Sequence, residues 1–197
     1  REKFLNKFNL NNDVFLISMY ARFHPIKNHE IFFKAIDKVI IKHPNIHIFL
    51  AGRYITWKNK KLKKLIYDCN LKNRITLGGL LNENDILSSY SATNITILTS
   101  LSESFPNVIG ESMACSTPCI SFNVGDCSEI IGTSGWIIQN NSVHELILKI
   151  EKAIELYRNK NEWSKLQGNC RKRIINNHSI KFEVEKYKNF ENSLFNS

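Results

Sequence analysis

The sequence predicts an α/β fold: a doubly wound, mostly parallel sheet of about six strands with helices on both faces. Short apolar runs alternate with longer amphipathic segments along the whole chain. The apolar runs are continuous, which is typical of strands that are covered on both faces of a parallel sheet. No internal repeat or low-complexity linker interrupts this rhythm, and 197 residues suit one domain (1–197) with its own core.

In the first half of the chain, each predicted strand is followed by a predicted helix, and the helix after the third strand begins the second half. The helix that begins at Lys27 carries apolar residues at helical spacing, and His43-Pro44-Asn45 is expected to end it. Glycine follows the second and third strands. We expect strands at 14–19, 46–51 and 74–77, and helices at 27–42 and 60–69.

The second half repeats the rhythm and ends in helices. Ser142 and Glu145 have the spacing of a capping box, which predicts a helix that begins at Ser142. We expect strands at 94–99, 118–122 and 135–138, and helices at 83–90, 107–115, 142–157, 162–176 and 181–193.

The formal net charge of +9 allows an anionic partner: nucleic acid, a membrane surface or a phosphorylated small molecule. Basic residues cluster at 58–64 and at 171–173, and each cluster is also compatible with a solvated helix face. No zinc-finger spacing or RNA-binding strand motif accompanies them. The apolar runs are far shorter than the roughly 20 residues that span a bilayer.

The five cysteines are odd in number and include no Cys-x-x-Cys pair. We therefore expect unpaired, partly buried thiols and a cytoplasmic location. The sequence begins with Arg1 rather than Met, and we expect it to be a piece of a longer chain. Trp57, Trp136 and Trp163 are expected to be packing residues, and His24 a loop residue.

Arg22 and Lys27 follow the first predicted strand and therefore lie at the carboxyl edge of the predicted sheet. Two cations beside a helix N-terminus form an anion site, because free N–H groups and the helix dipole add to the side-chain charges. The alternative is a pair of ordinary surface cations.

Glu103 and Glu111 follow the fourth predicted strand, eight residues apart. A carboxylate accepts two hydrogen bonds from a vicinal diol, so Glu111 is a candidate for holding a ribose, and Glu103 for facing a sugar. The backbone N–H groups of Phe105, Asn107 and Val108 open the next helix and are candidate donors to phosphate or sugar oxygens. The alternative is two solvated surface carboxylates.

With this context, most of the chain resembles the family 4 glycosyltransferases and their GT-B relatives, which contain two Rossmann-like domains. The resemblance rests on ordered motifs: Ala21-Arg22-x4-Lys27, the strand endings at 49–52 and 73–78, the Glu103-x7-Glu111 signature with its Pro106-Asn107 pair, and the segments 117–120, 124–126 and 129–131.

The resemblance implies that the chain is the C-terminal, nucleotide-sugar-binding half of a retaining glycosyltransferase. Arg22 and Lys27 would hold the donor diphosphate, Glu103 would lie beside the donor sugar, and Glu111 would bind the ribose. Backbone around Leu77 and Gly78 would contact the base, and Ser104, Phe105, Asn107 and Val108 would complete the donor site. No metal or other cofactor would be required, in agreement with the absence of an Asp-x-Asp motif.

Some positions depart from the family pattern: Asn28 and Ser104 replace common glycines, Ser112 replaces alanine, and Asp126 replaces a frequent second glycine. Ser104 and Asp126 would lie near the donor sugar. A subset of polysaccharide-synthesis members shares several of these features, including the His-Pro loop, which favours a role in bacterial capsule, exopolysaccharide or lipopolysaccharide assembly.

The resemblance also implies an acceptor-binding N-terminal domain that this chain lacks, so we expect the chain alone to be inactive. The last helix, within 180–197, is expected either to cross to that domain or to pack on this one through Phe182, Tyr187, Phe190 and Phe195. Basic helices on a cytoplasmic enzyme would allow peripheral contact with the inner face of the plasma membrane.

Two other classes of function stay open at this point. One is a GT-B relative with different chemistry, such as a nucleotide-sugar epimerase or a phosphorylase. The other is a non-enzymatic basic module that binds nucleic acid or membrane, for which a steep salt dependence would be the signature.

Overall fold

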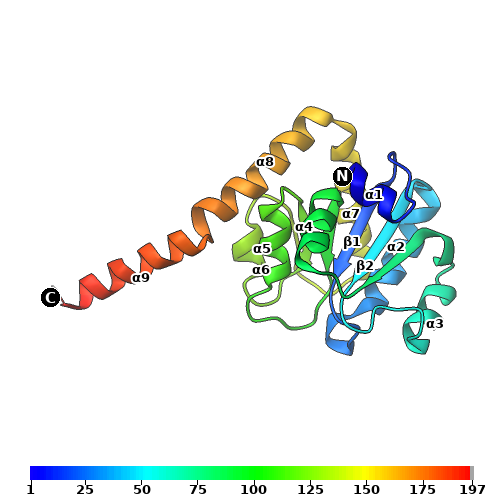
Figure 1. The fold of residues 1–197 in the computed structure, drawn as a ribbon, viewed down its shortest axis with the longest axis horizontal. Helices are drawn as coiled ribbons and strands as arrows, with labels where there is room; N and C mark the ends of the chain where they lie inside the picture. Colours follow the sequence, from blue (N-terminus) through cyan, green and yellow to red (C-terminus); the bar gives the residue numbers. More distant parts are fainter. Residues whose placement is uncertain (196–197) are drawn as a thin grey trace.

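The computed structural model describes residues 1–195, apart from the side chains at positions 183, 189, 190 and 192–195. The described chain forms a six-stranded, all-parallel sheet with the order β3-β2-β1-β4-β5-β6, flanked by helices (Figure 1). The predicted fold class is confirmed.

The strands lie within two residues of their predicted ends. Their bounds are β1 Phe15–Tyr20, β2 Ile46–Ala51, β3 Ile75–Gly79, β4 Ile95–Leu98, β5 Cys119–Phe122 and β6 Trp136–Ile138. Gly78 and Gly79 do not close β3 as expected but continue it, because Gly79 pairs with Ala51 and its carbonyl accepts a hydrogen bond from Gly52 N–H at 2.7 Å.

The helices are α1 Glu2–Lys7, α2 His29–Lys42, α3 Lys60–Asp68, α4 Glu83–Ala92, α5 Asn107–Ala114, α6 Cys127–Ile131, α7 Val143–Arg158, α8 Lys160–Asn177 and α9 Ile180–Phe195, with 3-10 turns η1 Pro25–Lys27 and η2 Lys72–Arg74. Helices α1 and α6 were not predicted. Each is shorter than two turns, so its sequence carries no readable periodicity, and its buried residues show that tertiary packing stabilises it.

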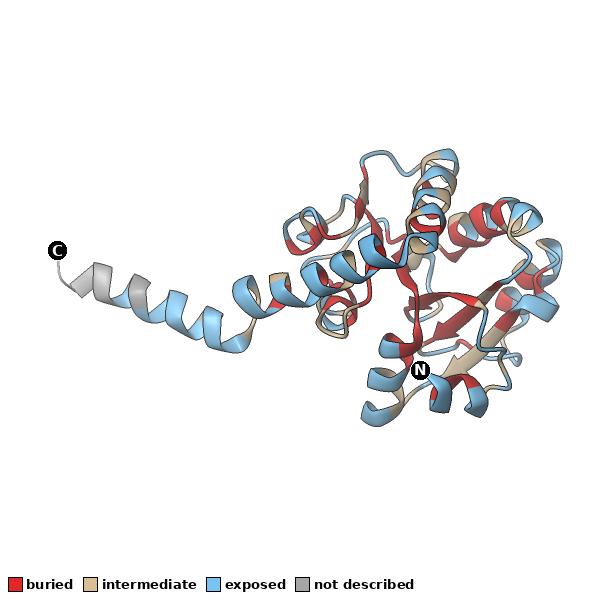
Figure 2. Cartoon of the chain, turned by 90° about the horizontal axis from the view of Figure 1, so that it is seen from above, coloured by how far each residue is buried: buried red, intermediate tan, exposed pale blue. Residues whose placement is uncertain are grey.

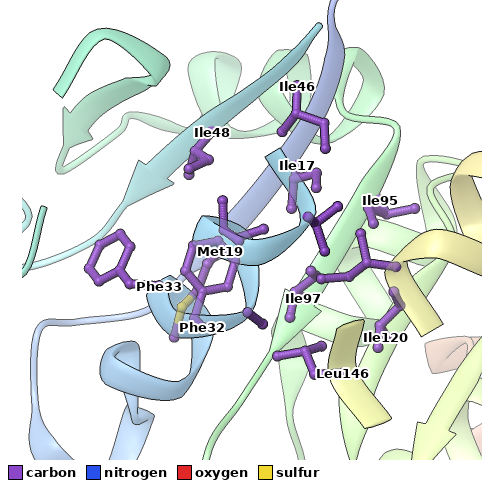
Figure 3. Packing of buried hydrophobic residues seen from close by; sticks show 14 of the residues in the cluster. Ile17, Met19, Phe32, Phe33, Ile46, Ile48, Ile95, Ile97, Ile120 and Leu146 are labelled. Atoms are coloured by element: carbon purple, nitrogen blue, oxygen red, sulfur yellow. The ribbon is translucent and has the colours of Figure 1, made fainter. Parts of the chain in front are cut away.

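The strands alternate their side chains between two apolar layers. In β1, Phe15, Ile17 and Met19 pack against helices α2, α3 and α7, whereas Leu16 and Tyr20 pack against α1 and α4 on the opposite face. The second face continues beneath α5, α6 and α8. Figure 3 shows the first layer, and Figure 2 shows that the buried residues follow the strands and the inner helix faces.

The basic cluster at 171–173 includes two arginines with structural roles. Arg171 Nη1 donates to the Ala114 carbonyl at 2.6 Å, at the end of α5. Arg173 donates to the Ile130 carbonyl at 2.8 Å and to the Glu129 carbonyl, near the end of α6. Cations at helix C-termini neutralise carbonyl groups that lack intrahelical partners, so these arginines attach α8 to the domain.

Helix α9 extends away from the sheet (Figures 1 and 2). Phe182 and Tyr187 are exposed on it, so the structure does not pack these two aromatics on the core. The side chains of Phe190 and Phe195, which were predicted to join them, lie outside the described residues.

The cysteines are unpaired, as predicted, and Cys119, Cys127 and Cys170 are buried in one layer. Burial raises the pKa of each of these three thiols, which keeps them protonated near neutral pH. Among the described helices, none combines the length and the hydropathy of a membrane span.

The predicted cap of α7 is present: Ser142 Oγ accepts the Glu145 backbone N–H at 3.3 Å. Removing this acceptor in Ser142→Ala leaves an orphan donor in the first turn. We expect the free energy of unfolding, measured by urea denaturation, to fall by about 1 kcal/mol. Ser142→Asp restores an acceptor and should stay near the parent; an equal loss in both variants would contradict a capping role.

His29, the first residue of α2, is buried against Phe23, with ring centroids 5.1 Å apart. Within the described structure neither of its ring nitrogens has a hydrogen-bond partner. Burial, with a smaller contribution from the Lys27 charge, lowers the pKa of His29 to about 4. The folded state therefore holds this imidazole neutral.

Because the unfolded-state pKa of histidine is about 6.5, the unfolded chain binds a proton at His29 that the folded chain excludes between pH 6.5 and pH 4. The stability is complete above that window and falls as the pH drops. Between pH 7 and pH 5 we expect His29 to contribute a loss of about 2 kcal/mol. In denaturation series at both pH values, His29→Phe should show a shallower loss than the parent; an unchanged slope would contradict the assignment.

Candidate functional site

The strand order reverses at the boundary between β1 and β4, which lie side by side at the centre of the sheet. The chain leaving β1 crosses towards β2 and the chain leaving β4 crosses towards β5, so their loops diverge at the carboxyl edge. In open parallel sheets, ligands bind in the crevice that such a divergence creates. The predicted phosphate and carboxylate residues lie on these two loops.

Hydrogen bonds to backbone carbonyls join the two loops to each other. Leu101 N–H donates to the Ile26 carbonyl at 2.8 Å. The buried Thr99 hydroxyl donates to the Lys27 carbonyl at 3.0 Å or to the Asn28 carbonyl at 3.1 Å. These bonds fix the position of the β1 loop relative to the end of β4.

Lys27 lies in the 3-10 turn η1 and not, as predicted, in the first turn of α2. Asn28 separates the two elements with a left-handed backbone, φ 51° and ψ 48°. Asparagine adopts this conformation more readily than most residues, which explains why it can replace the glycine that is common at this position. His24 is a loop residue, as predicted: its Nδ1 accepts the Ile26 N–H at 3.3 Å.

The central contact of the site is the ion pair between Lys27 Nζ and Glu103 Oε1, at 2.5 Å. The Lys27 side chain is 19% exposed and the Glu103 side chain 14% exposed, so solvent screens this pair less than a surface pair. Arg22, at the end of β1, is exposed and takes part in no ion pair with the described residues. An incoming anion would find Arg22 free and would compete with Glu103 for Lys27.

The loop after β5 packs against the backbone of Glu103 and Ser104. Gly125 has φ +49°, and a Cβ atom there would lie 2.3 Å from the Ser104 carbonyl oxygen and 2.4 Å from that of Glu103. Only glycine allows both the conformation and this approach. The next residue, Asp126, donates its backbone N–H to the same Ser104 carbonyl at 3.2 Å.

Glu111 projects from α5 as an exposed carboxylate that a buried residue orients. Tyr90 of α4 donates its hydroxyl to Glu111 Oε2 at 2.7 Å, and the Tyr90 side chain is fully buried beside Tyr20. Burial and the bond to Glu111 raise the pKa of Tyr90, so the hydroxyl stays a donor at physiological pH. The other Glu111 oxygen makes no hydrogen bond to the described side chains.

The remaining residues predicted for the donor site near α5 do not all present free groups. Ser104 and Phe105 are exposed beside Glu103. The Asn107 backbone N–H is not free as predicted, because it donates to the Phe105 carbonyl at 3.0 Å. Val108 is half-buried against the layer that contains Tyr90.

Leu77 and Gly78 lie on β3, which β2 separates from β1. Both are half-buried, and a Cβ at Gly78 would lie 2.6 Å from the Phe49 ring. The structure thus places these two residues at the edge strand, apart from the Lys27–Glu103 pair.

Sequence reasoning missed the roles of Thr99, Tyr90 and Gly125. Thr99 directly follows β4, and a polar residue at the carboxyl end of a buried strand was the only local signal. Tyr90 carries no local signal, because its contact joins separate helices. Among the described residues, no group of three or more His, Cys, Asp or Glu side chains is arranged to hold a metal ion.

Comparison with known proteins identifies a family and several relatives. The family model described as "Glycosyl transferases group 1" matches residues 1–173. The chain is 28% identical over 193 residues to the Escherichia coli UDP-Gal:alpha-D-GlcNAc-diphosphoundecaprenol alpha-1,3-galactosyltransferase, covering 95% of this chain and 47% of that protein. It is 27% identical over 133 residues to the D-inositol 3-phosphate glycosyltransferase of Paenarthrobacter aurescens (strain TC1), covering 66% of this chain and 33% of that protein.

Solved structures share the fold over nearly the entire chain. A glycosyltransferase from Rickettsia africae ESF-5 superposes with a TM-score of 0.85 at 26% identity, covering 98% of this chain and 51% of that chain. Anabaena HepE in complex with UDP-glucose has a TM-score of 0.80 at 20% identity, covering 96% of this chain and 52% of that chain.

The Escherichia coli and Rickettsia africae proteins match nearly all of this chain, and the chain spans about half of their length. The family model covers most of the chain, and the motifs on which the earlier resemblance rested lie within the matched residues. The chain belongs to the group 1 glycosyl transferases, and its fold is that of the C-terminal half of a GT-B enzyme.

Proposed function

We propose that this chain binds the nucleotide-sugar donor of a retaining glycosyltransferase, and that the donor is a UDP-sugar. The observation that carries the proposal is the meeting of Lys27 and Glu103 at the strand-order reversal, with Arg22 exposed in the same loop as Lys27. A cationic group at this point suits a diphosphate, and a carboxylate next to it suits the sugar that the diphosphate carries.

Arg22 and Lys27 act on the leaving group in this proposal. The bond from the anomeric carbon to the β-phosphate oxygen breaks, its electron pair goes to that oxygen, and the two cations neutralise the charge that develops there. A hydroxyl of the acceptor forms the new glycosidic bond and gives its proton to the departing β-phosphate oxygen. Glu103 faces the positive charge at the anomeric carbon, and retention of configuration follows the pattern that is typical of the family.

Glu111 binds the ribose of the nucleotide in this proposal. Its orientation by Tyr90 leaves one carboxylate oxygen available for a ribose hydroxyl. The backbone around Leu77 and Gly78 then contacts the base. Relatives support uracil, since the Escherichia coli protein is named for a UDP-Gal donor and HepE was crystallised with UDP-glucose.

The acceptor is a glycan or a lipid-linked sugar used in bacterial surface polysaccharide synthesis. The name of the Escherichia coli relative supports a diphosphoundecaprenol-linked acceptor. Ser104 and Asp126, which are joined through a backbone hydrogen bond, are the residues that distinguish the donor sugar. Such an enzyme acts in the cytoplasm at the inner face of the plasma membrane. Acceptor binding is assigned to a further domain, so donor binding is the property to measure on this chain.

The ribose assignment is tested by calorimetric titration with UDP, GDP and ADP. Glu111→Ala removes the carboxylate, and we expect UDP affinity to fall about 10- to 100-fold, as for the loss of a hydrogen bond to a charged group. Tyr90→Phe keeps the Glu111 carboxylate but removes the hydroxyl that orients it, and we expect UDP affinity to fall by less than 10-fold. Unchanged UDP affinity in Glu111→Ala would refute the ribose assignment.

The two partners of the central ion pair should change UDP affinity in opposite directions. Lys27→Ala removes a phosphate ligand and should weaken UDP binding by 10-fold or more. Glu103→Gln removes the carboxylate that competes with phosphate for Lys27, so UDP should bind equally well or up to about 10-fold more tightly. A similar loss in both variants would mean that the pair only maintains the loop.

A further inference from the structure

The positive charge of the protein is concentrated in one segment. Residues 53–74 contain eight lysines and arginines and a single carboxylate, Asp68, which gives the segment a net charge of +7 out of the formal +9 of the whole chain. The segment comprises the loop after β2, helix α3 and the turn η2. The remaining 175 residues are therefore close to electrical balance.

Most cations of this segment are available to a partner; Arg74 is an exception, because its Nη1 donates to the Pro44 carbonyl. Lys58, Lys60, Lys61 and Lys63 are exposed, and none of them forms an ion pair with the described residues. Lys64 alone pairs with Asp68, at 2.7 Å. This differs from Arg171 and Arg173, whose guanidinium groups are occupied by helix carbonyls.

Exposed aromatic side chains lie among these cations. Trp57, predicted to be a packing residue, is instead 44% exposed, and Tyr54 and Tyr67 are exposed as well. Lys63 and Lys72 both lie over the Tyr67 ring, with Nζ 5.7 Å and 5.5 Å from its centroid, and Arg53 lies over Tyr54. Helix α3 buries Leu62 and Ile66 inward, which leaves its lysines and Tyr67 on the outside.

The loop 53–59 and helix α3 together are called the α3 surface. We propose that the α3 surface docks on an anionic lipid membrane. Lysines attract anionic headgroups, and their long stems pack on apolar surface while the charged ends stay in water. Tryptophan and tyrosine favour the boundary between headgroups and acyl chains. This combination of unpaired lysines with Trp57 and two tyrosines fits a lipid surface.

The α3 surface is joined to the donor site by the backbone. Phe23 N–H, in the loop after β1, donates to the Arg53 carbonyl at 2.8 Å. Docking through loop 53–59 therefore holds the carboxyl edge of the sheet close to the bilayer. The inference rests on the proposed function in one respect: a lipid-linked acceptor explains why the donor site should lie close to a membrane. The charge and exposure of the α3 surface do not depend on the proposed function.

The test is co-sedimentation of the protein with vesicles of phosphatidylcholine that contain 0 to 40% phosphatidylglycerol. We expect binding to rise with the phosphatidylglycerol fraction and to fall with salt. The variant with Lys58, Lys60, Lys61 and Lys63 changed to Gln should bind on the order of 100-fold more weakly or worse, because each lysine near an anionic surface contributes roughly a 5-fold factor.

A matched control removes the same charge elsewhere, from the exposed lysines of α7 and α8: Lys152, Lys160, Lys165 and Lys172 to Gln. Its vesicle binding should change about 3-fold or less. Equal losses in the two quadruple variants would mean that net charge, not the α3 surface, drives binding, and would overturn the inference. Binding to single-stranded RNA or duplex DNA in place of vesicles would also overturn it.

Trp57 provides a reporter of where the contact forms, because Trp136 and Trp163 are buried. Anionic vesicles should shift the tryptophan emission of the parent to shorter wavelength, and Trp57→Phe should abolish the shift. A shift that persists in Trp57→Phe contradicts docking through loop 53–59. UDP titration of the same proteins separates the two proposals: absent vesicle binding with intact UDP binding overturns only the membrane surface.

Discussion

The structure depends on one topological constraint, the reversal of strand order between β1 and β4. The chain leaves β1 towards β2 and β4 towards β5, so it leaves the two central strands in opposite directions. Right-handed crossovers then place the helices that follow these two strands on opposite faces of the sheet. The crevice between the diverging loops then lies at the carboxyl edge, where Lys27 and Glu103 meet. The apolar layers on both faces of β1 hold the central strands in place. The loops that follow these strands are therefore anchored at the core.

Buried polar groups beneath the site fix the positions of its residues through hydrogen bonds. Thr99 is buried and donates its hydroxyl to the Lys27 or the Asn28 carbonyl, and Tyr90 is buried and donates its hydroxyl to the carboxylate of Glu111. A buried hydroxyl has a strong preference for keeping its partner, since an unsatisfied polar group in the interior costs roughly 1–3 kcal/mol. The site residues are therefore preorganised by the core and not only by each other, with Gly125 supporting Glu103 through close backbone approach.

The two basic clusters show that clustered cations in a sequence can have different structural roles. Arg171 and Arg173 neutralise the ends of α5 and α6 and are part of the architecture. The lysines of α3 belong to a helix that buries only its Leu62 and Ile66 side, and they lie on an exposed face within the segment 53–74, which carries most of the net charge of the protein. Whether a cation has a carbonyl or water as its neighbour decides which role it can take.

The sequence by itself determined the fold class, all six strands of the described sheet and the candidate residues, because these depend on local periodicity and on which residues follow each strand. It placed Arg22, Lys27, Glu103 and Glu111 near the carboxyl edge and identified the family from ordered motifs. The tertiary structure alone decided the pairing of Lys27 with Glu103, the support of Glu111 by Tyr90, and the existence of α1 and α6. These features arise from contacts between residues far apart in the chain, which no local pattern of charge or hydrophobicity can encode.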